Sequence, residues 1–387
     1  MSTSTASNLP SRDGIIAPLT GLRFVAASLV VFFHYFETVR VFDGASLPWI
    51  TLLNGNGQTG VSIFFALSGF LITARYRDQW VARSISFWQY WRKRFIRIYP
   101  AYFFALVALV IVPEVLTGST AYFNPLTVGG LLILAQAFSL TLFPLGIPIG
   151  WTLTLEELYY VVAPRLARVL DAPSVGLVLL KGAGLVGLSA GIFALIVAVP
   201  ASYSFTGFSE EFIYQVSLFV RLPEFIAGAV SGLVFAKLSR NREPGSSRDR
   251  ATVILVPTAA VIGMILFVVS NGYFLGHIWW VSAVFRFGGA CCAALLMLGF
   301  GLARTPSAFG RWLGSDRIEY LGRASYALYL VHLTKPVQWM WAALHALPIH
   351  PMALVPLIFV ISVAASVLLY ELVERPMHAR LLRGLPG

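Results

Sequence analysis

Charged side chains are scarce in this sequence. Asp, Glu, Lys and Arg together make up 12% of its 387 residues, about half of the roughly 25% that is typical of a soluble globular domain. Hydrophobic residues account for 58%, and they gather in runs close to the roughly 20 residues that cross a bilayer as one helix. The scarcity of charge therefore excludes an ordinary soluble protein and predicts an all-α, polytopic membrane protein.

Cysteine is scarce too, and common catalytic signatures are missing. Cys291 and Cys292 are the two cysteines, and they are adjacent within an apolar run, a spacing that suits neither a disulfide framework nor a metal site. No Walker loop and no HExxH motif occurs, which argues against the commonest nucleotide hydrolases and zinc proteases. The first seventeen residues lack the features of a signal peptide. We therefore expect an enzyme or carrier without a metal.

Basic residues outnumber acidic ones, 28 to 17, and they cluster between the apolar runs. In membrane proteins such clusters report orientation, because cytoplasmic loops are rich in Lys and Arg. We therefore place both termini on the cytoplasmic side of the membrane. The expected organisation is a cytoplasmic tail over 1–14, a transmembrane domain over 15–375 and a second cytoplasmic tail over 376–387. The segments expected to be cytoplasmic as well are 75–97, 237–250 and 303–323.

The number of membrane crossings follows from these assignments. Apolar stretches suited to helices fall near 15–39, 57–74, 98–117, 124–143, 150–170, 174–199, 212–237, 251–271, 278–302, 324–346 and 351–373. An odd number of crossings must separate Pro113, placed outside, from Asp171, placed inside, yet two of these stretches lie between them. Irregular backbone at membrane depth is tolerated where it lines a cavity. The sequence thus predicts about ten transmembrane helices plus a re-entrant or broken segment near 124–170, and leaves open whether 124–143 or 150–170 spans.

The first apolar stretch carries two side chains that are costly in lipid, Arg23 and His34. Eleven positions along a helix make about three turns, so the two project from nearly the same face, roughly 16 Å apart along the axis. Facing lipid, such a pair would be strongly unfavourable, so this face should look into the protein or a water-filled cavity. A neutral histidine suits proton transfer near pH 7. His34 is therefore a candidate base, with a hydrogen-bonded packing role as the alternative.

Other polar residues lie in apolar contexts. The run WTLTLEELYY places Glu156 next to Glu157, and only one of these carboxylates can point directly at the interior. Arg221 and Glu224 are three residues apart in RLPEFIAG, where a mutual ion pair that serves structure is the alternative to a functional role. His332 ends the run SYALYLVH, near the end of a predicted helix.

The stretch SISFWQYWRKRFIRIYP, residues 84–100, mixes aromatic residues with arginines. One interpretation is a helix on the membrane surface that is attracted to anionic lipid. The other is that Arg94 and Arg97 face a cavity and bind a phosphorylated ligand, because the guanidinium fork matches phosphate geometry. The two interpretations are compatible.

Taken in order, these motifs resemble the integral-membrane acyltransferase 3 family. The spacing of Arg23 and His34 is that family's signature, and the further motifs follow in the family's order as GQTGVSIFFALSGFLIT, RKRFIRIYPAY, WTLTLEELYY, RLPEFIAG, LGRASYALYLVH and ERP. The resemblance covers nearly the whole chain. It implies a ten-helix membrane core that moves an acyl group, usually acetyl, from cytoplasmic acyl-CoA to a hydroxyl. The acceptor is often a cell-surface carbohydrate or its lipid-linked precursor. The resemblance also implies a plasma membrane, most simply a bacterial inner membrane.

The resemblance also implies roles for individual residues. His34 would act as base or as transient acyl acceptor, within a catalytic set completed by Arg23 and Glu156. Phosphates of the acyl-CoA donor would bind Arg23, Arg94 and Arg97. Substrate contact or structural support would come from Arg221, Glu224, Tyr326 and His332. The expected partners are membrane lipid, acyl-CoA, a carbohydrate or lipid-linked acceptor and a separate periplasmic accessory protein, with no metal and no nucleic acid.

Three other functions stay open. Some members of the family acylate macrolide-like small metabolites. Intramembrane Arg, His and Glu also suit a secondary transporter or a flippase of glycolipid intermediates, and a non-catalytic membrane partner of another enzyme is a further possibility. Only the enzyme must release the free thiol of coenzyme A, so that product distinguishes it from a carrier or a scaffold.

Overall fold

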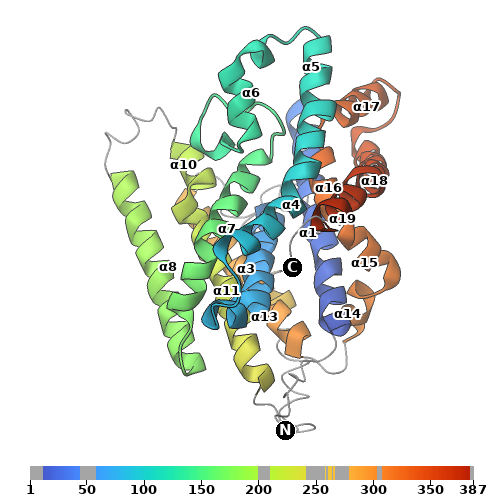
Figure 1. The fold of residues 1–387 in the computed structure, drawn as a ribbon. Coiled ribbons are helices and arrows are strands. Elements are labelled where there is room, and N and C mark those ends of the chain that lie inside the picture. Colours follow the sequence, from blue (N-terminus) through green and yellow to red (C-terminus); the bar gives the residue numbers. More distant parts are fainter. Residues whose placement is uncertain are drawn as a thin grey trace.

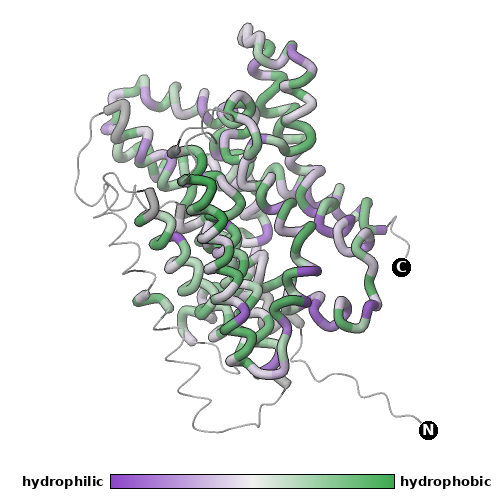
Figure 2. The backbone as a smooth tube through the Cα atoms, turned by 90° about the vertical axis from the view of Figure 1, so that its left-hand side faces the viewer, coloured by the Kyte–Doolittle hydropathy of each residue, from purple (hydrophilic) through white to green (hydrophobic). Residues whose placement is uncertain are grey.

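The computed structural model describes residues 12–43, 58–198, 210–240, 258, 260–263, 265, 279–302 and 307–383. Within these residues every regular element is a helix and none is a strand, which confirms the all-α prediction. Figure 1 shows long helices standing side by side, with α8 at one edge and α17 to α19 at the other. Hydrophobic residues dominate the long helices (Figure 2).

Seven helices in the described ranges are long and apolar enough to cross a membrane. The chain is therefore a multi-pass membrane protein, while the total of about ten spans stays a prediction. Most of the stretch near 251–271 lies outside the described residues. The candidate spans run over Ala17–Val39, Thr59–Val81, Phe87–Leu116, Val175–Ala198, Phe212–Ser239, Ala283–Leu302 and Pro351–Arg383.

The helices that form these spans are bounded as follows. They are α1 (Arg12–Asp43), α3 (Gln58–Val81), α4 (Phe87–Leu106) continued by a π-helical turn into α5 (Val112–Leu116), α8 (Val175–Ala198), α10 (Glu210–Val216) with α11 (Leu218–Arg240), α13 (Trp279–Leu302), and α18 (Pro351–Leu369) continued into α19 (Arg375–Arg383). The remaining helices are α6 (Pro125–Leu132), α7 (Gly150–Leu170), α14 (Ala308–Leu313), α15 (Asp316–Arg323), α16 (Ser325–Val331) and α17 (Lys335–His345).

The broken segment predicted near 124–170 is present between α5 and α7. Its α6 has eight residues, roughly 12 Å of helix, which is too short to cross a bilayer. The side-chain amide of Gln136 donates to the carbonyl oxygens of Leu145 and Ile147 at 2.7 and 3.0 Å and so closes the loop on itself. Of the two stretches left open, 124–143 is thus the broken one. The other is the continuous 21-residue helix α7.

Three other segments show structural details that were not predicted. The stretch 324–346 is two helices rather than one, because Pro336 has no N–H to donate to the carbonyl of His332; α16 ends at Val331, and Pro336 stands in the first turn of α17. The stretch 84–100 is not a separate surface helix; Ser86 caps α4, which continues without a break toward Leu116. The expected start of the C-terminal tail at 376 falls inside the continuous helix that joins α18 to α19.

Helices α3 and α11 form the centre of the described bundle, and they pack closely because glycines face each other's backbone. A Cβ atom on Gly228 would collide with the carbonyl of Ala66, and one on Gly69 with the carbonyl of Phe225. Small residues let membrane helices approach until their backbones touch. Helices α1, α7 and α13 pack against α3 in turn. This centre holds α1 and α7, which carry the candidate functional residues.

Candidate active site

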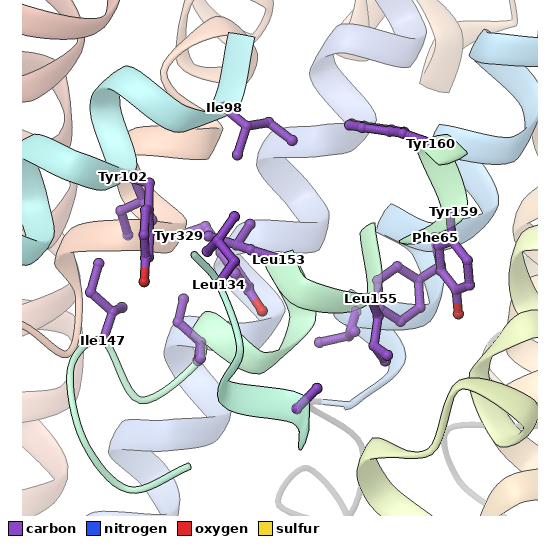
Figure 3. Packing of buried hydrophobic residues seen from close by; sticks show 14 of the residues in the cluster. Phe65, Ile98, Tyr102, Leu134, Ile147, Leu153, Leu155, Tyr159, Tyr160 and Tyr329 are labelled. Carbon is purple, nitrogen blue, oxygen red and sulfur yellow. The ribbon is translucent and has the colours of Figure 1, made fainter. Parts of the chain in front are cut away.

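A cavity lies between α1, α3, α4, α7 and α16. It contains about 680 Å³ of space free of protein atoms, including the part open to the surroundings. Apolar side chains of α3 line the cavity, as do Leu153 of α7 and Tyr329 of α16; Figure 3 shows these last two residues close together within the buried cluster. The polar lining residues are Arg23, Ser68, Arg94, Arg97, Thr152, Glu156, Tyr160, Tyr326 and Tyr329. The structure thus brings together five of the residues that the sequence singled out, namely Arg23, Arg94, Arg97, Glu156 and Tyr326.

The charges that line this cavity are unbalanced. Arg23, Arg94 and Arg97 stand against the single carboxylate of Glu156, and no residue that the structure describes forms an ion pair with any of these three arginines. Arg94 donates to the hydroxyl of Tyr76 at 3.0 Å, and its guanidinium carbon lies 5.2 Å from the centre of that ring. Excess positive charge in a cavity attracts anionic ligands, and guanidinium groups suit phosphate.

Glu156 is held by hydroxyl groups from two helices. Its Oε1 accepts hydrogen bonds from Ser68 of α3 at 2.8 Å and from Tyr160 of α7 at 2.6 Å. We expected Glu156 to pair with His34 or Arg23, but its hydrogen bonds in the described part of the chain go to these hydroxyls instead. The neighbouring Glu157 is absent from the cavity lining, as expected for two carboxylates that point in different directions.

His34 and His332 form a pair that joins α1 to the break between α16 and α17. Nε2 of His332 lies 3.3 Å from Nδ1 of His34, and the ring centres are 5.2 Å apart. His332 is completely buried, and Tyr35 donates to its backbone carbonyl oxygen. The break near residue 332 therefore has a consequence for the site, because it places a second histidine directly against the first.

The hydrogen bonds of this pair assign the tautomer of each ring. Nδ1 of His332 lies 2.9 Å from the carbonyl oxygen of Tyr329 and 3.2 Å from that of Leu328. Carbonyl oxygens only accept, so this Nδ1 carries the proton and Nε2 of His332 holds a lone pair. Nδ1 of His34 faces that lone pair and also the carbonyl oxygen of Val30 at 2.9 Å, so it too carries a proton. The lone pair of neutral His34 is consequently on Nε2.

The histidine pair lies behind the inner wall of the cavity rather than in its lining. Tyr329 forms the connection: it lines the cavity, and its ring centre is 6.1 Å from that of His332. Its hydroxyl lies 2.8 Å from that of Thr152, which donates to the backbone carbonyl of Ile149. Arg23 is roughly 16 Å from His34 along α1. The cavity therefore extends from an arginine-rich end toward the histidines.

Other predicted residues have structural contacts. Arg221 and Glu224 form an ion pair at 3.0 Å in which both side chains are buried, outside the cavity lining. The guanidinium carbon of Arg221 also lies 5.4 Å from the ring centre of Trp151. Their geometry is that of the mutual ion pair considered as the alternative. Tyr326 donates to the backbone carbonyl of Ile98 at 2.9 Å and so ties α16 to α4.

One short run has the spacing of a serine hydrolase motif. Residues 187–191 read GLSAG, which matches GxSxG, the motif of a strand-to-helix turn that exposes a nucleophilic serine. Here the run lies inside α8, and Ser189 is buried and donates to the backbone carbonyl of Phe219 at 2.8 Å. The structural context of a nucleophile is missing.

Sequence reasoning did not single out four hydroxyl groups of the cavity. Ser68, Thr152, Tyr160 and Tyr329 all lie within motifs quoted above. In an apolar helix a lone hydroxyl residue usually satisfies its own backbone, so no signal distinguished these residues from packing. The one available signal was that each of these four residues lies within a motif of the family.

The described helices form a membrane-type helical core in which a histidine pair lies next to a cationic cavity. The chain belongs to the acyltransferase 3 family, since the family's acyltransferase domain matches residues 16–371. It is therefore an acyltransferase.

Two of three similar proteins are named as acyltransferases or acetyltransferases. The chain is 28% identical to Acyltransferase MdmB of Streptomyces mycarofaciens, over 98% of this chain and 95% of that protein. It is 24% identical to Peptidoglycan O-acetyltransferase OatA of Listeria monocytogenes, over 83% of this chain and 50% of that protein. It is 29% identical to Nodulation protein 10 of Rhizobium leguminosarum, over 38% of this chain and 43% of that protein. No solved structure matches.

Proposed function

We propose that this protein is an O-acetyltransferase that moves an acetyl group from cytoplasmic acetyl-CoA to a hydroxyl of a cell-surface carbohydrate or its lipid-linked precursor. The observation that carries the proposal is the cationic cavity whose lining residue Tyr329 lies next to the histidine pair. Similarity to a protein named Peptidoglycan O-acetyltransferase supports the acetyl group and the carbohydrate acceptor. Because this chain covers half of that relative, its acceptor belongs to the proposal.

The donor would lie along the length of the cavity. Its phosphates would bind Arg94 and Arg97 on α4 and Arg23 on α1, and its uncharged arm would follow the apolar wall of α3. Lining residues of that wall run from Val61 to Ile72, which spans roughly 16 Å of helix. The thioester would then lie near Tyr329, on the side of the cavity closest to His34.

His34 would act as a general base in the transfer. Its Nε2 takes the proton of the acceptor hydroxyl while the hydroxyl oxygen attacks the thioester carbonyl carbon. A carbon–oxygen bond forms and the carbon–sulfur bond breaks. The coenzyme A thiolate leaves and is protonated by the imidazolium, which restores neutral His34. His332 would accept the hydrogen bond from Nδ1–H of His34 throughout and so stabilise the imidazolium as it forms.

The orientation in the membrane is part of the proposal. Coenzyme A thioesters are made in the cytoplasm, and Arg94 and Arg97 follow the basic turn that the positive-inside rule assigns to that side. The acceptor would enter from the opposite face of a plasma membrane. A separate accessory protein would present that acceptor.

Purified protein in lipid nanodiscs tests this function. With acetyl-CoA and an extract of lipid-linked or polymeric cell-surface carbohydrate, we expect release of coenzyme A thiol in step with acetyl ester formation on the carbohydrate. A small-metabolite fraction serves as the competing acceptor. Movement of glycolipid across vesicles without thiol release would contradict the proposal and favour a flippase.

A further inference from the structure

A second cavity lies on the same side of α3 and α7 as the first. It contains about 890 Å³ of free space, part of it open, and its lining residues are Trp80, Arg83, Ile85, Phe87, Val161, Pro164, Arg165 and Arg168. On α3, Ile72 lines the first cavity and Trp80 the second, and residues at this spacing share a helix face. The second cavity therefore lies about two turns beyond the first, toward the turn that joins α3 to α4.

A layer of aromatic side chains separates the two cavities. Tyr76, Trp80 and Tyr90 are all buried, and the centres of their rings are 5.1 to 5.7 Å apart. The hydroxyl of Tyr76 also accepts a hydrogen bond from Arg94. A molecule in the first cavity cannot reach the second without displacing this layer. The second cavity is therefore a site of its own rather than an extension of the donor site.

The second cavity combines apolar walls with uncompensated positive charge. In the described ranges, the exposed Arg83, Arg165 and Arg168 form no ion pair, although Arg168 donates to the backbone carbonyl of Pro164 at 3.1 Å. The nearby carboxylate of Asp171 is bound to Arg77 at 2.8 Å and Lys237 at 3.5 Å. Trp80 is 6% exposed, and its indole N–H has no hydrogen-bond partner. Three guanidinium groups around one cavity suit an anionic ligand with acceptor oxygens.

The position of this cavity relative to the membrane identifies the kind of ligand. Its Arg83, Ile85 and Phe87 belong to the region between two candidate spans, which end at Val81 and begin at Phe87. It therefore lies at the membrane surface, on the side that the basic turn assigns to the cytoplasm. Val161 precedes Arg165 by one helical turn on α7, farther from the cytoplasmic end of that helix, and it is 42% exposed, so an apolar chain would find a path along α7 into the membrane.

We propose that this cavity binds the phosphate headgroup of an anionic phospholipid from the cytoplasmic leaflet. The three arginines would hold the phosphate, and an acyl chain would lie against the exposed Val161 of α7. Basic pockets between membrane helices on the cytoplasmic side recognise anionic headgroups in this way. The bound lipid would fix the turn between α3 and α4 against α7, next to the helices that line the catalytic cavity.

Native mass spectrometry of the full-length protein, titrated with phosphatidylglycerol or phosphatidylcholine, tests this site. We expect the native protein to retain phosphatidylglycerol in preference. The variant R83Q/R165Q/R168Q should lose that binding by on the order of a hundredfold, because each basic residue near an anionic leaflet contributes about a factor of five. The matched control R317Q/R380Q/R383Q removes the same charge from exposed arginines elsewhere and should bind as the native protein does.

Three outcomes would overturn the assignment. Unchanged lipid binding in the first variant would show that the three arginines do not bind the lipid. Equal loss in both variants would show that the binding depends on general surface charge. Displacement of the bound lipid by adenosine 3′,5′-bisphosphate would assign the cavity to the donor instead. If the first variant fails to fold, V161W provides the second test, since it fills the cavity and keeps every charge. It should lose phosphatidylglycerol as well.

Discussion

Replacement of His332 by leucine separates its proposed role from a purely structural one. In the proposed reaction Nδ1–H of His34 donates to Nε2 of His332 while His34 becomes positively charged. Leucine has a similar size but no acceptor atom. We therefore expect the substitution to slow acyl transfer and to leave the affinity for acyl-CoA unchanged, because His332 lies outside the cavity lining.

The size of this effect follows from the geometry. A hydrogen bond to a charged group contributes about 1.5–3 kcal/mol, and each 1.36 kcal/mol changes a rate roughly tenfold. The nitrogen atoms of the pair are 3.3 Å apart, slightly beyond the usual range for such a bond. His34 also keeps its hydrogen bond to Val30. We therefore use the lower end of this free-energy range, about 1.5 kcal/mol, and expect kcat to fall about tenfold.

The assay is steady-state release of coenzyme A thiol at varied acyl-CoA concentration, with the melting temperature measured in parallel. Replacement of His332 by glutamine is the matched control, because its carbonyl oxygen can accept from His34 and its amide can donate to the backbone. It should restore part of kcat. Equal activity of the leucine variant and the native enzyme, at equal stability, would refute the role assigned to His332, as would a change in KM alone.

Further predictions concern donor binding, packing and orientation. Arg94→Ala and Arg97→Ala should each weaken acyl-CoA binding in a calorimetric titration, with Lys restoring only part of it because it lacks the bidentate fork; unchanged affinity would show that these two arginines do not bind the donor phosphates. Gly228→Leu should destabilise the fold by at least the roughly 1–3 kcal/mol of an overpacked core, since its side chain would meet the backbone of α3; a native melting temperature would contradict the packing described. A cysteine at Arg83 should react with a membrane-impermeant label only from the cytoplasm, and one at Gly118 only from outside, and the reverse would invert the orientation.

Much of this fold is predictable because lipid imposes a simple rule. The long apolar runs that become α3, α8 and α13 are read directly from the sequence, since an apolar span of that length has few alternatives to a helix. The break between α16 and α17 is not read in this way. Hydropathy stays high through it, and only Pro336 indicates that one helix ends and another begins.

The site was predictable in its members but not in its contacts. The cost of placing Arg23, Arg94 and Glu156 in an apolar environment marks them as residues that face a cavity, and the structure places all three around one. The pairing of His34 with His332 depends on how residues 298 positions apart meet. Neither helical periodicity nor charge carries that information. Glu156 was therefore expected to contact His34, whereas His332 makes that contact.

The central claim is that Nε2 of His34 carries the acyl transfer. Single-turnover transfer by His34→Ala, measured beside its binding of acyl-CoA, tests it most directly. A lost general base costs a factor of roughly 10² to 10⁴, so we predict that transfer is nearly abolished while the donor still binds, because Arg23, Arg94 and Arg97 are untouched. If His34→Ala transfers the acyl group at the native rate, His34 is not the base and the mechanism is wrong.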